Sequence, residues 1–318
     1  MIYVGLDISK DTIDVHLIDH LETWLKIDND SAGWQSLLDL LAKYPEEPIR
    51  ACCEYTGIYY LGVATALYEA GYRISVVNAY SIKHYARLMM RRTKTDRKDA
   101  QLIADYLRVN DPPDWQPPAE ELAQIKRLNR RLGQLVAMRT MEENRRQVAD
   151  ESCAASCTAI IDSVEAQIVA VEALLQNIIG GDAKLKEKQK LLMSIPGLGK
   201  KSAAILLPEV AEIDRFPTPK HLVSYIGLSP MQRESGTSVR TKGHISKMGN
   251  KHVRSALFMP ARSACLRSRV FKDWAKAHME RGKAPKVVYV MMMRKILTYA
   301  WHVFKENQPF DEKILKRS

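Results

Sequence analysis

Short apolar runs alternate with amphipathic stretches in the first part of the chain, a pattern typical of strands and helices in one sheet. The strand-like runs read IYVGLDI, TIDVHLID, IRACCEY and YRISVVN. Amphipathic stretches at 34–44 and 59–70 predict helices, and 81–109 is helical again. Two opening strands that can pair as a hairpin, followed by alternating strands and helices, predict a mixed α/β sheet. Because the run DPPDWQPP cannot continue a helix, we assign the first domain to residues 1–112.

Residues 113–190 have long helical stretches with a regular apolar seam. Apolar residues recur there at alternating steps of three and four, the spacing of a coiled coil. The clearest seam is Ile161, Val164, Ile168, Val171, Leu175 and Ile178. A looser one is Leu122, Ile125, Leu128, Leu132, Leu135 and Met138. The pattern predicts a helical coiled-coil arm, which either folds on itself within one chain or joins subunits.

The segment LLMSIPGLGKKSAAILLPEV predicts a helix, a tight turn and a second helix. This spacing resembles a helix-hairpin-helix, in which glycines let backbone amides approach a phosphate of nucleic acid. Gly197 and Gly199 would form the turn, and Lys200 and Lys201 would lie beside the phosphate. An ordinary helical turn is the alternative. The segment opens a mostly helical domain that we assign to residues 191–318.

Charge is unevenly distributed along the 318 residues, whose net charge is +11. Residues 191–318 hold 24 Lys and Arg against 9 Asp and Glu, a net charge of +15, and residues 1–190 hold 24 against 28, a net charge of −4. Between Arg233 and Arg269, nine basic residues accompany one acid. This density exceeds what solubility requires, so we expect the C-terminal domain to bind nucleic acid.

Composition limits further which kind of protein this chain can be. With 46% hydrophobic and 27% charged residues, the chain has the make-up of a globular protein. Its five cysteines lack paired CxxC spacing, which favours buried thiols in a reducing cytosol over disulfides or zinc. The start of the chain has no secretion-signal pattern, and the apolar stretch 287–303 is interrupted by Arg294 and Lys295. We expect a cytoplasmic protein without a membrane span.

Four carboxylates have the placement of a metal site. Asp7 and Glu54 each lie at the end of a strand-like run, and Asp96 and Asp99 share one face at a helix start. Singly, each has a structural alternative as a turn cap or a first-turn helix acid. Together they are the ingredients of an RNase H-like site. Their oxygens suit Mg²⁺ or Mn²⁺, and two such ions can hold the attacking and leaving oxygens of a phosphodiester.

Basic residues lie beside the helical acids and also in the C-terminal domain, and we expect both groups to bind nucleic acid. Those beside the helical acids are Arg91, Arg92, Lys94, Arg97 and Lys98. Those in the C-terminal domain are Arg233, Arg240, Lys242, Lys247, Lys251 and Arg254.

These motifs, in this order, resemble one protein family. GLDISKDTIDV, EYTGIYY and TKTDRKDAQLIADYL resemble the N-terminal domain of DEDD insertion-sequence transposases of the IS-one-ten type, which are bridge-RNA-guided recombinases. IPGLGKKSAAILLPEVAEIDRFPTPKHLVSYIGLSP and RESGTSVRTKGHISKMGNKHVRSAL resemble their transposase domain. The resemblance implies a RuvC-like fold for the first domain, with Asp7, Glu54, Asp96 and Asp99 as the DEDD acids.

The resemblance also places the family's catalytic serine at Ser235, in the polar loop ESG. In similar proteins this serine forms a covalent phosphoserine link with DNA beside Mg²⁺, and the site can be shared between subunits. Ser238 in the same loop and Ser229 upstream of it are alternative nucleophiles. The loop has no His or Asp closer than His244, so activation of the hydroxyl must come from elsewhere.

The implied partners are double-stranded DNA at the element ends and target, a non-coding guide RNA, and further copies of the chain. These copies would form a dimer, or a tetramer in the synaptic complex, in the bacterial cytosol with the nucleoid. Two other functions remain open: a RuvC-like endonuclease that uses metal-activated water, and a non-catalytic DNA-binding protein. An actin-like ATPase would share the opening strand and GxDxx motif, but the sequence has no second phosphate-binding glycine loop.

Overall fold

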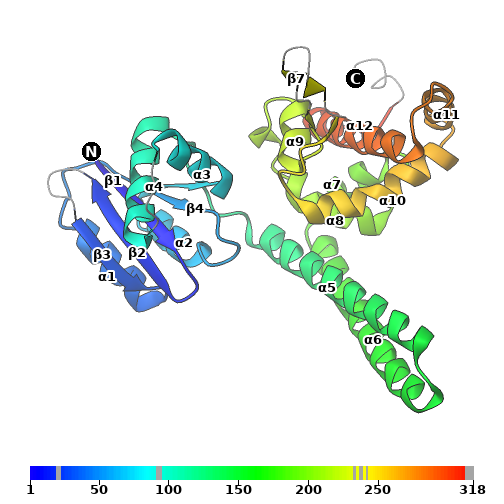
Figure 1. Cartoon of the computed structure of the whole chain (residues 1–318), viewed down its shortest axis with the longest axis horizontal. Helices are drawn as coiled ribbons and strands as arrows, with labels where there is room; N and C mark the ends of the chain where they lie inside the picture. The colour runs from blue at the N-terminus through cyan, green and yellow to red at the C-terminus, as the bar shows by residue number, and fades with distance from the viewer. Residues whose placement is uncertain (19–22, 91–94, 232–233, 236–238, 241–242, 312–318) are drawn as a thin grey trace. The chain divides into compact units, whose positions relative to one another are not determined.

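The computed structural model divides the chain into two compact units, Met1–Pro118 and Ala119–Ser318 (Figure 1). It describes residues 1–18, 23–90, 95–231, 234–235, 239–240 and 243–311. The boundary between the units lies at the end of the proline-rich run. The helical arm and the C-terminal helices belong to one unit. The three-domain division at residues 112 and 190 stays a prediction.

The first unit is built on a five-stranded sheet with the order β3-β2-β1-β4-β5. Its strands are β1 (Ile2–Ile8), β2 (Thr12–Ile18), β3 (Thr23–Asp28), β4 (Ile49–Glu54) and β5 (Arg73–Val77). The β1–β2 and β2–β3 pairs are antiparallel, whereas β1, β4 and β5 run parallel. The predicted mixed α/β sheet with its opening hairpin is therefore confirmed.

Strand β3 is the one strand of this sheet that the sequence pattern did not predict. It lies at the edge of the sheet, and Ile27 is its one buried residue. Because an edge strand packs few side chains into the core, it lacks the long apolar run by which central strands are recognised.

Helices cover both faces of this sheet. They are α1 (Ser31–Leu41), α2 (Leu61–Glu69), α3 (Ala79–Leu88) and α4 (Asp96–Asn110). Apolar residues of α1 and α2 share a core with the even-numbered residues of β1, such as Val4 and Leu6. Residues of α3 and α4 instead form a core with Tyr3 and Cys52. Since side chains alternate along a strand, the odd-numbered residues of β1 face α4.

Gly5 lets α4 lie directly against β1. A Cβ atom at this position would overlap the carbonyl oxygen of Ala100 and lie 2.9 Å from the Cβ of Ala104. A residue without a side chain is therefore required at this contact. The close approach sets where the first turn of α4 lies over the sheet.

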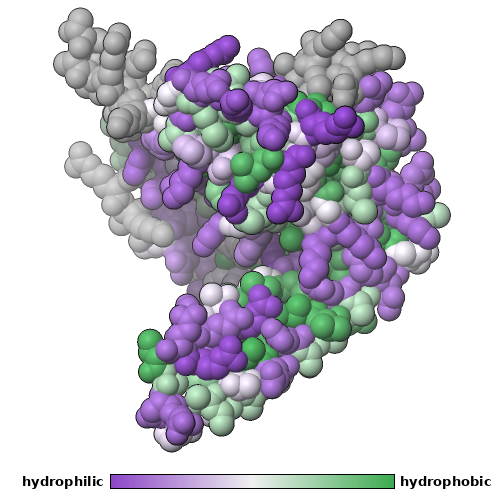
Figure 2. All heavy atoms as spheres, turned by 90° about the vertical axis from the view of Figure 1, so that its right-hand side faces the viewer, coloured by the Kyte–Doolittle hydropathy of each residue, from purple (hydrophilic) through white to green (hydrophobic). Residues whose placement is uncertain are grey.

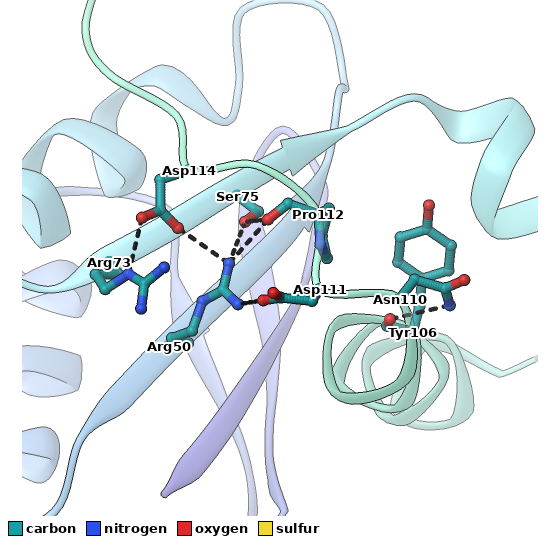
Figure 3. Close-up of polar contacts among 8 residues, drawn as sticks. All are labelled: Arg50, Arg73, Ser75, Tyr106, Asn110, Asp111, Pro112 and Asp114. Atoms are coloured by element: carbon teal, nitrogen blue, oxygen red, sulfur yellow. Dashed lines mark hydrogen bonds and ion pairs between the residues drawn. The ribbon is translucent and has the colours of Figure 1, made fainter.

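The segment that follows α4 is held against the sheet by Arg50, a β4 residue that is only 4% exposed (Figure 3). Its guanidinium donates to the carboxylate of Asp111, to the carbonyl oxygen of Pro112 at 2.8 Å and to the carboxylate of Asp114 at 3.0 Å. Arg73 donates to the same Asp114 carboxylate at 2.8 Å. A charged side chain is stable at this depth because it is paired and hydrogen-bonded.

Trp115 extends this attachment by three residues beyond the predicted boundary at 112. Its backbone N–H donates to the carbonyl oxygen of Ile74 at 2.6 Å. Its ring meets Tyr60 and Tyr68 edge-on, with centroid distances of 6.1 and 6.4 Å. The proline-rich segment therefore packs on the first unit as far as residue 115.

The second unit begins with two long helices, α5 (Glu120–Val148) and α6 (Glu151–Gly181), which pack on each other. Leu135 of α5 forms an apolar cluster with Val164, Ile168 and Val171 of α6. The predicted seam is thus buried within one chain, as the intramolecular alternative expects. At its end Ile179, rather than Ile178, is the buried residue, a step of four from Leu175. The coiled-coil geometry itself stays a prediction.

The rest of the second unit is mostly helical around α12 (Pro285–Glu306), whose Tyr299 stacks on Phe271 at 5.6 Å. The surrounding helices are α7 (Ala183–Met193), α8 (Lys200–Val210), η1 (Ile213–Arg215), α9 (Pro219–Ile226), α10 (Lys251–Arg267) and α11 (Lys272–Glu280). Between α9 and α10 lie the short strands β6 (Pro230–Met231), β7 (Glu234–Ser235), β8 (Val239–Arg240) and β9 (His244–Ile245).

Hydrophilic residues cover most of the face that Figure 2 shows, on the side of α11 and the arm. Among the described residues, no helix is both long and apolar enough to cross a membrane.

Candidate active site

The register of the sheet places Asp7 beside Glu54. Strands β1 and β4 are parallel and pair Gly5 with Cys52 and Leu6 with Cys53, so Asp7 and Glu54 are the next residues of each strand. Cys52 packs in the core on the α3–α4 side, and Glu54 lies two residues further along β4. Both acids therefore project from the face that α4 covers.

The other two predicted acids come from the first turn of α4. Thr95 caps this helix by accepting a hydrogen bond from the backbone N–H of Lys98 at 3.4 Å. Asp96 is exposed and lies 4.0 Å from the Lys26 ammonium, whereas Asp99 is half-buried. Because α4 lies against β1 at Gly5, this turn stands over the end of the strand that carries Asp7.

The electrostatics of Asp7 indicate how crowded these acids are. Burial raises the pKa of its carboxyl from 3.8 to about 6, aided by the negative charges of Asp99, Asp96 and Glu54, and then of Asp14. A carboxylate is harder to ionise where other carboxylates are close. All four sequence-predicted acids thus lie in one region of the first unit.

Asp14 is the fifth acid of this region, and sequence reasoning missed it. It pairs with Asp7 across the β1–β2 ladder and is only 4% exposed. Lys26 lies 3.3 Å from its carboxylate, and the indole N–H of Trp24 donates to it at 3.1 Å. The run TIDVHLI gives no local signal for this role, because the register of β1 and β2 is what places Asp14 on the same face as Asp7.

These acids have the donor atoms that a divalent cation prefers, but their side chains are not arranged in a coordination shell. Among the described residues, no group of three or more His, Cys, Asp or Glu side chains is arranged to hold a metal ion. Carboxylate oxygens are nevertheless the donors that Mg²⁺ prefers, and a cation would offset the crowded negative charge around Asp7.

The basic residues beside these acids are described only in part. Arg97 lies over the ring of Trp24, with its guanidinium carbon 5.4 Å from the ring centroid. Lys98 is exposed on the same turn of α4. Arg91, Arg92 and Lys94 lie outside the described residues.

Ser235 lies in a short hairpin of the second unit. Strands β7 and β8 pair antiparallel, with Ser235 opposite Val239 and Glu234 opposite Arg240. Gly236, Ser238, Arg233 and Lys242 lie outside the described residues.

A buried glutamate that sequence reasoning missed lies between the helices on either side of this hairpin. Glu209 of α8 is 8% exposed and lies 3.4 Å from the Lys126 ammonium. It accepts hydrogen bonds from Tyr225 Oη at 3.1 Å and from Asn250 Nδ2 at 3.0 Å. Tyr225 precedes the hairpin, and Asn250 caps the helix that follows it. Glu209 therefore links the end of α9 to the start of α10, the two helices between which the serine lies in sequence.

Three predicted basic residues follow the hairpin. Lys247 and Lys251 are exposed, and the Lys247 backbone N–H donates to the carbonyl oxygen of Gly227. Arg254 instead points inward and donates to the carbonyl oxygen of Ile226 at 2.8 Å. Its described contact is thus with the end of α9.

The predicted glycine turn lies between α7 and α8. Gly197 has a positive φ of 96°, which favours glycine, and Gly199 caps α8 without a side-chain hydrogen bond. Lys200 is exposed at the helix start. Lys201 is paired with Glu172 of α6 at 2.6 Å.

Comparison with known proteins gives matches over both units. A family model for DEDD transposases of the IS110 type, described as "Transposase", matches residues 4–149. A second, described as "Transposase IS116/IS110/IS902 family", matches residues 189–278.

Two relatives match over nearly the whole chain. The pilin gene-inverting proteins of Moraxella bovis and Moraxella lacunata are each 32% identical to it, over 98% of both chains. An uncharacterized 43.6 kDa protein of insertion element IS110 from Streptomyces coelicolor is 29% identical over 51% of this chain and 38% of its own.

Proposed function

The chain belongs to the IS110 family of transposases, and from this premise we propose that it recombines DNA with Mg²⁺ at its carboxylates and Ser235 as nucleophile. As a member of this family it is an enzyme that cleaves DNA and transfers strands. The mixed sheet with its helices fits the RuvC-like fold of such transposases.

The observation that carries the proposal is the meeting of four acids from three separate segments on one face of the sheet. Asp7 and Glu54 come from neighbouring strands, and Asp96 and Asp99 from a helix held close by Gly5. Burial, aided by the negative charges of the other acids, raises the pKa of Asp7 to about 6, and a cationic ligand would offset the cost of ionising this carboxyl.

Asp7, Glu54, Asp96 and Asp99 would hold Mg²⁺, or Mn²⁺, through carboxylate oxygens. When bound, the ion supplies Lewis acidity beside the scissile phosphate. Arg97 and Lys98, on the same turn of α4, would bind the neighbouring DNA backbone.

Ser235 would attack the phosphorus through its hydroxyl oxygen. A Ser235 Oγ–P bond forms, the P–O bond to a deoxyribose oxygen breaks, and the serine proton passes to that leaving oxygen through solvent. The ester conserves the phosphodiester bond energy until a second strand's hydroxyl attacks it. Gly236 and the basic residues Arg233, Arg240 and Lys242 flank the serine in sequence and would bind the phosphate.

We assign the chain three partners. These are double-stranded DNA at the element ends and target, a guide RNA that pairs with it, and further copies of the chain in a dimer or tetramer with shared active sites. The chain would work in the bacterial cytosol with the nucleoid. Because the guide RNA would recognise the DNA sequence by base pairing, the protein would need to contact only the backbone and the shape of the nucleic acid.

The test is strand exchange by Asp99→Ala with a junction DNA and its flanking RNA. We expect exchange to be lost while DNA binding changes little, because a metal ligand and no phosphate contact is removed. Asp105→Ala is the matched control, since Asp105 lies later on α4 and pairs with Arg108 at 3.3 Å. Full exchange by Asp99→Ala would exclude the carboxylates from the chemistry.

A second function, DNA inversion, is favoured by the names of the two full-length relatives, both pilin gene-inverting proteins. A supercoiled plasmid that carries two inverted sites is a substrate with which DNA inversion can be distinguished from excision. Inversion changes the restriction pattern and keeps every base pair, whereas excision yields a shorter plasmid.

A further inference from the structure

A cleft of about 360 Å³ opens in the second unit between the glycine turn and α10. The turn and α8 contribute Gly197 and Ser202 to its lining. Helix α10 contributes Met259, Pro260, Arg262, Ser263, Leu266 and Arg267.

The α10 residues form one continuous face because they recur at helical spacing. Met259 is followed three and four residues later by Arg262 and Ser263, and these by Leu266 and Arg267. Ser263 and Arg267 therefore lie in one row of this face, and Arg262 lies in the neighbouring row.

The charge of the cleft is unbalanced. Its lining contains two arginines and no acid. Within the described part of the chain, neither Arg262 nor Arg267 is paired with a carboxylate, whereas Lys201 nearby pairs with Glu172. Two cationic side chains left uncompensated in one concave surface favour an anion.

The glycine turn packs tightly on α10 and fixes this shape. A Cβ atom at Gly197 would lie 2.5 Å from the carbonyl oxygen of Pro260 and 2.9 Å from the Cβ of Ala264. The start of α8, where Ser202 lies in the first turn, is held beside α10 by this contact. The distance between the two sides of the cleft, the start of α8 and the face of α10, is therefore fixed by this packing.

We propose that this cleft binds the sugar-phosphate backbone of duplex DNA. Arg262 and Arg267 would contact phosphate oxygens, and the hydroxyls of Ser202 and Ser263 would donate to them. Met259, 58% exposed, and Leu266, 47% exposed, stand beside the arginines and would contact deoxyribose, which is the apolar part of the backbone. A free phosphate ion would use the charges but not these apolar neighbours.

This assignment adds phosphate contacts on α10 to those that the sequence predicts for Lys200 and Lys201. It rests on the DNA substrate of the family and is independent of the Ser235 chemistry. Contacts of this kind position the protein on DNA and read no sequence.

The test is the salt dependence with which the full-length protein binds a 20-base-pair duplex of arbitrary sequence, followed by fluorescence anisotropy. Each phosphate contact contributes roughly 0.9 to the slope of log K against log salt. The double variant Arg262→Gln/Arg267→Gln should lower the slope by roughly 2 and weaken binding roughly 30-fold at about 150 mM salt. Arg262→Lys/Arg267→Lys should keep most of the slope.

The matched control is Arg269→Gln/Arg281→Gln, which removes the same charge from exposed positions of the same unit outside the cleft. An equal loss in both double variants would overturn the proposal, because the effect would then be one of net charge. A loss confined to an RNA hairpin competitor would also overturn it and assign the cleft to RNA. At saturating DNA the cleft variant should still form the serine adduct, so failure of one proposal leaves the other measurable.

Discussion

Replacing Asp7 by Asn should stabilise the metal-free protein at neutral pH, although the residue belongs to the proposed catalytic site. Burial and the nearby carboxylates raise the pKa of the Asp7 carboxyl from 3.8 to about 6 in the folded chain. A folded-state pKa above the unfolded value means that the folded protein binds the proton more tightly. The stability that this proton contributes is complete below pH 4 and is lost as the pH rises through 6.

The size of the effect follows from this shift. One pKa unit corresponds to about 1.4 kcal/mol, so the shift of roughly two units sets an upper bound of about 3 kcal/mol. Because Asp7 is half-buried and solvent screens part of the repulsion, we expect about 1–2 kcal/mol at pH 7.5. Asn keeps the shape and removes the charge. The variant and the parent should therefore have equal stability near pH 4, diverge between pH 4 and pH 6, and keep a constant difference above pH 6.

Hydrogen exchange of β1 amides in EDTA measures this stability within the first unit. At pH 7.5 the Asp7→Asn protein should exchange roughly 5- to 30-fold more slowly after correction for intrinsic rates. Excess Mg²⁺ should protect the parent and leave the variant nearly unchanged. The control is Asp39→Asn, on the exposed side of α1. It should change neither the exchange rate in EDTA nor the protection by Mg²⁺. Faster exchange by Asp7→Asn in EDTA at pH 7.5 would refute the cost of burying a charged Asp7 among other carboxylates.

Three further outcomes test how the fold holds the site. Arg50→Met should cost about 2–4 kcal/mol, because it removes every guanidinium bond to the segment after α4, and limited proteolysis should then cut near Trp115 sooner. Gly5→Val should push α4 off β1 and abolish Mg²⁺-dependent strand exchange, and an active variant would contradict that role. Ile168→Glu should lower the helical circular dichroism by unfolding the arm, while sizing chromatography shows an unchanged oligomer; dissociation into monomers would assign the seam to a subunit contact.

Much of the first unit follows from the sequence because its central strands are buried on both faces and therefore read as apolar runs. Strands β1, β2, β4 and β5 lie at nearly the positions that the apolar runs predict. Asp7 and Glu54 could be singled out because an acid at the end of such a run is unusual. The spacing of Asp96 and Asp99 placed both on one helix face.

The features that escaped prediction depend on tertiary neighbours. Asp14 and Arg50 are polar residues inside apolar strands, and nothing local shows that Lys26 or Asp114 will pair with them. Glu209 likewise lies in an apolar helix, and its partners come from segments distant in the chain. Pairing at long range decides whether such residues lie in the core or in a site, and a single sequence does not contain that information.

The most direct test of the account is to locate the covalent link between protein and DNA. The purified protein is incubated with its junction DNA, guide RNA and Mg²⁺, denatured and digested, and the modified peptide is sequenced by mass spectrometry. We expect a nucleotide on Ser235, no adduct with Ser235→Ala, and an adduct retained by Ser238→Ala. An adduct that persists in Ser235→Ala, or cleaved DNA that never becomes protein-linked, would contradict the serine recombinase and favour hydrolysis by metal-activated water.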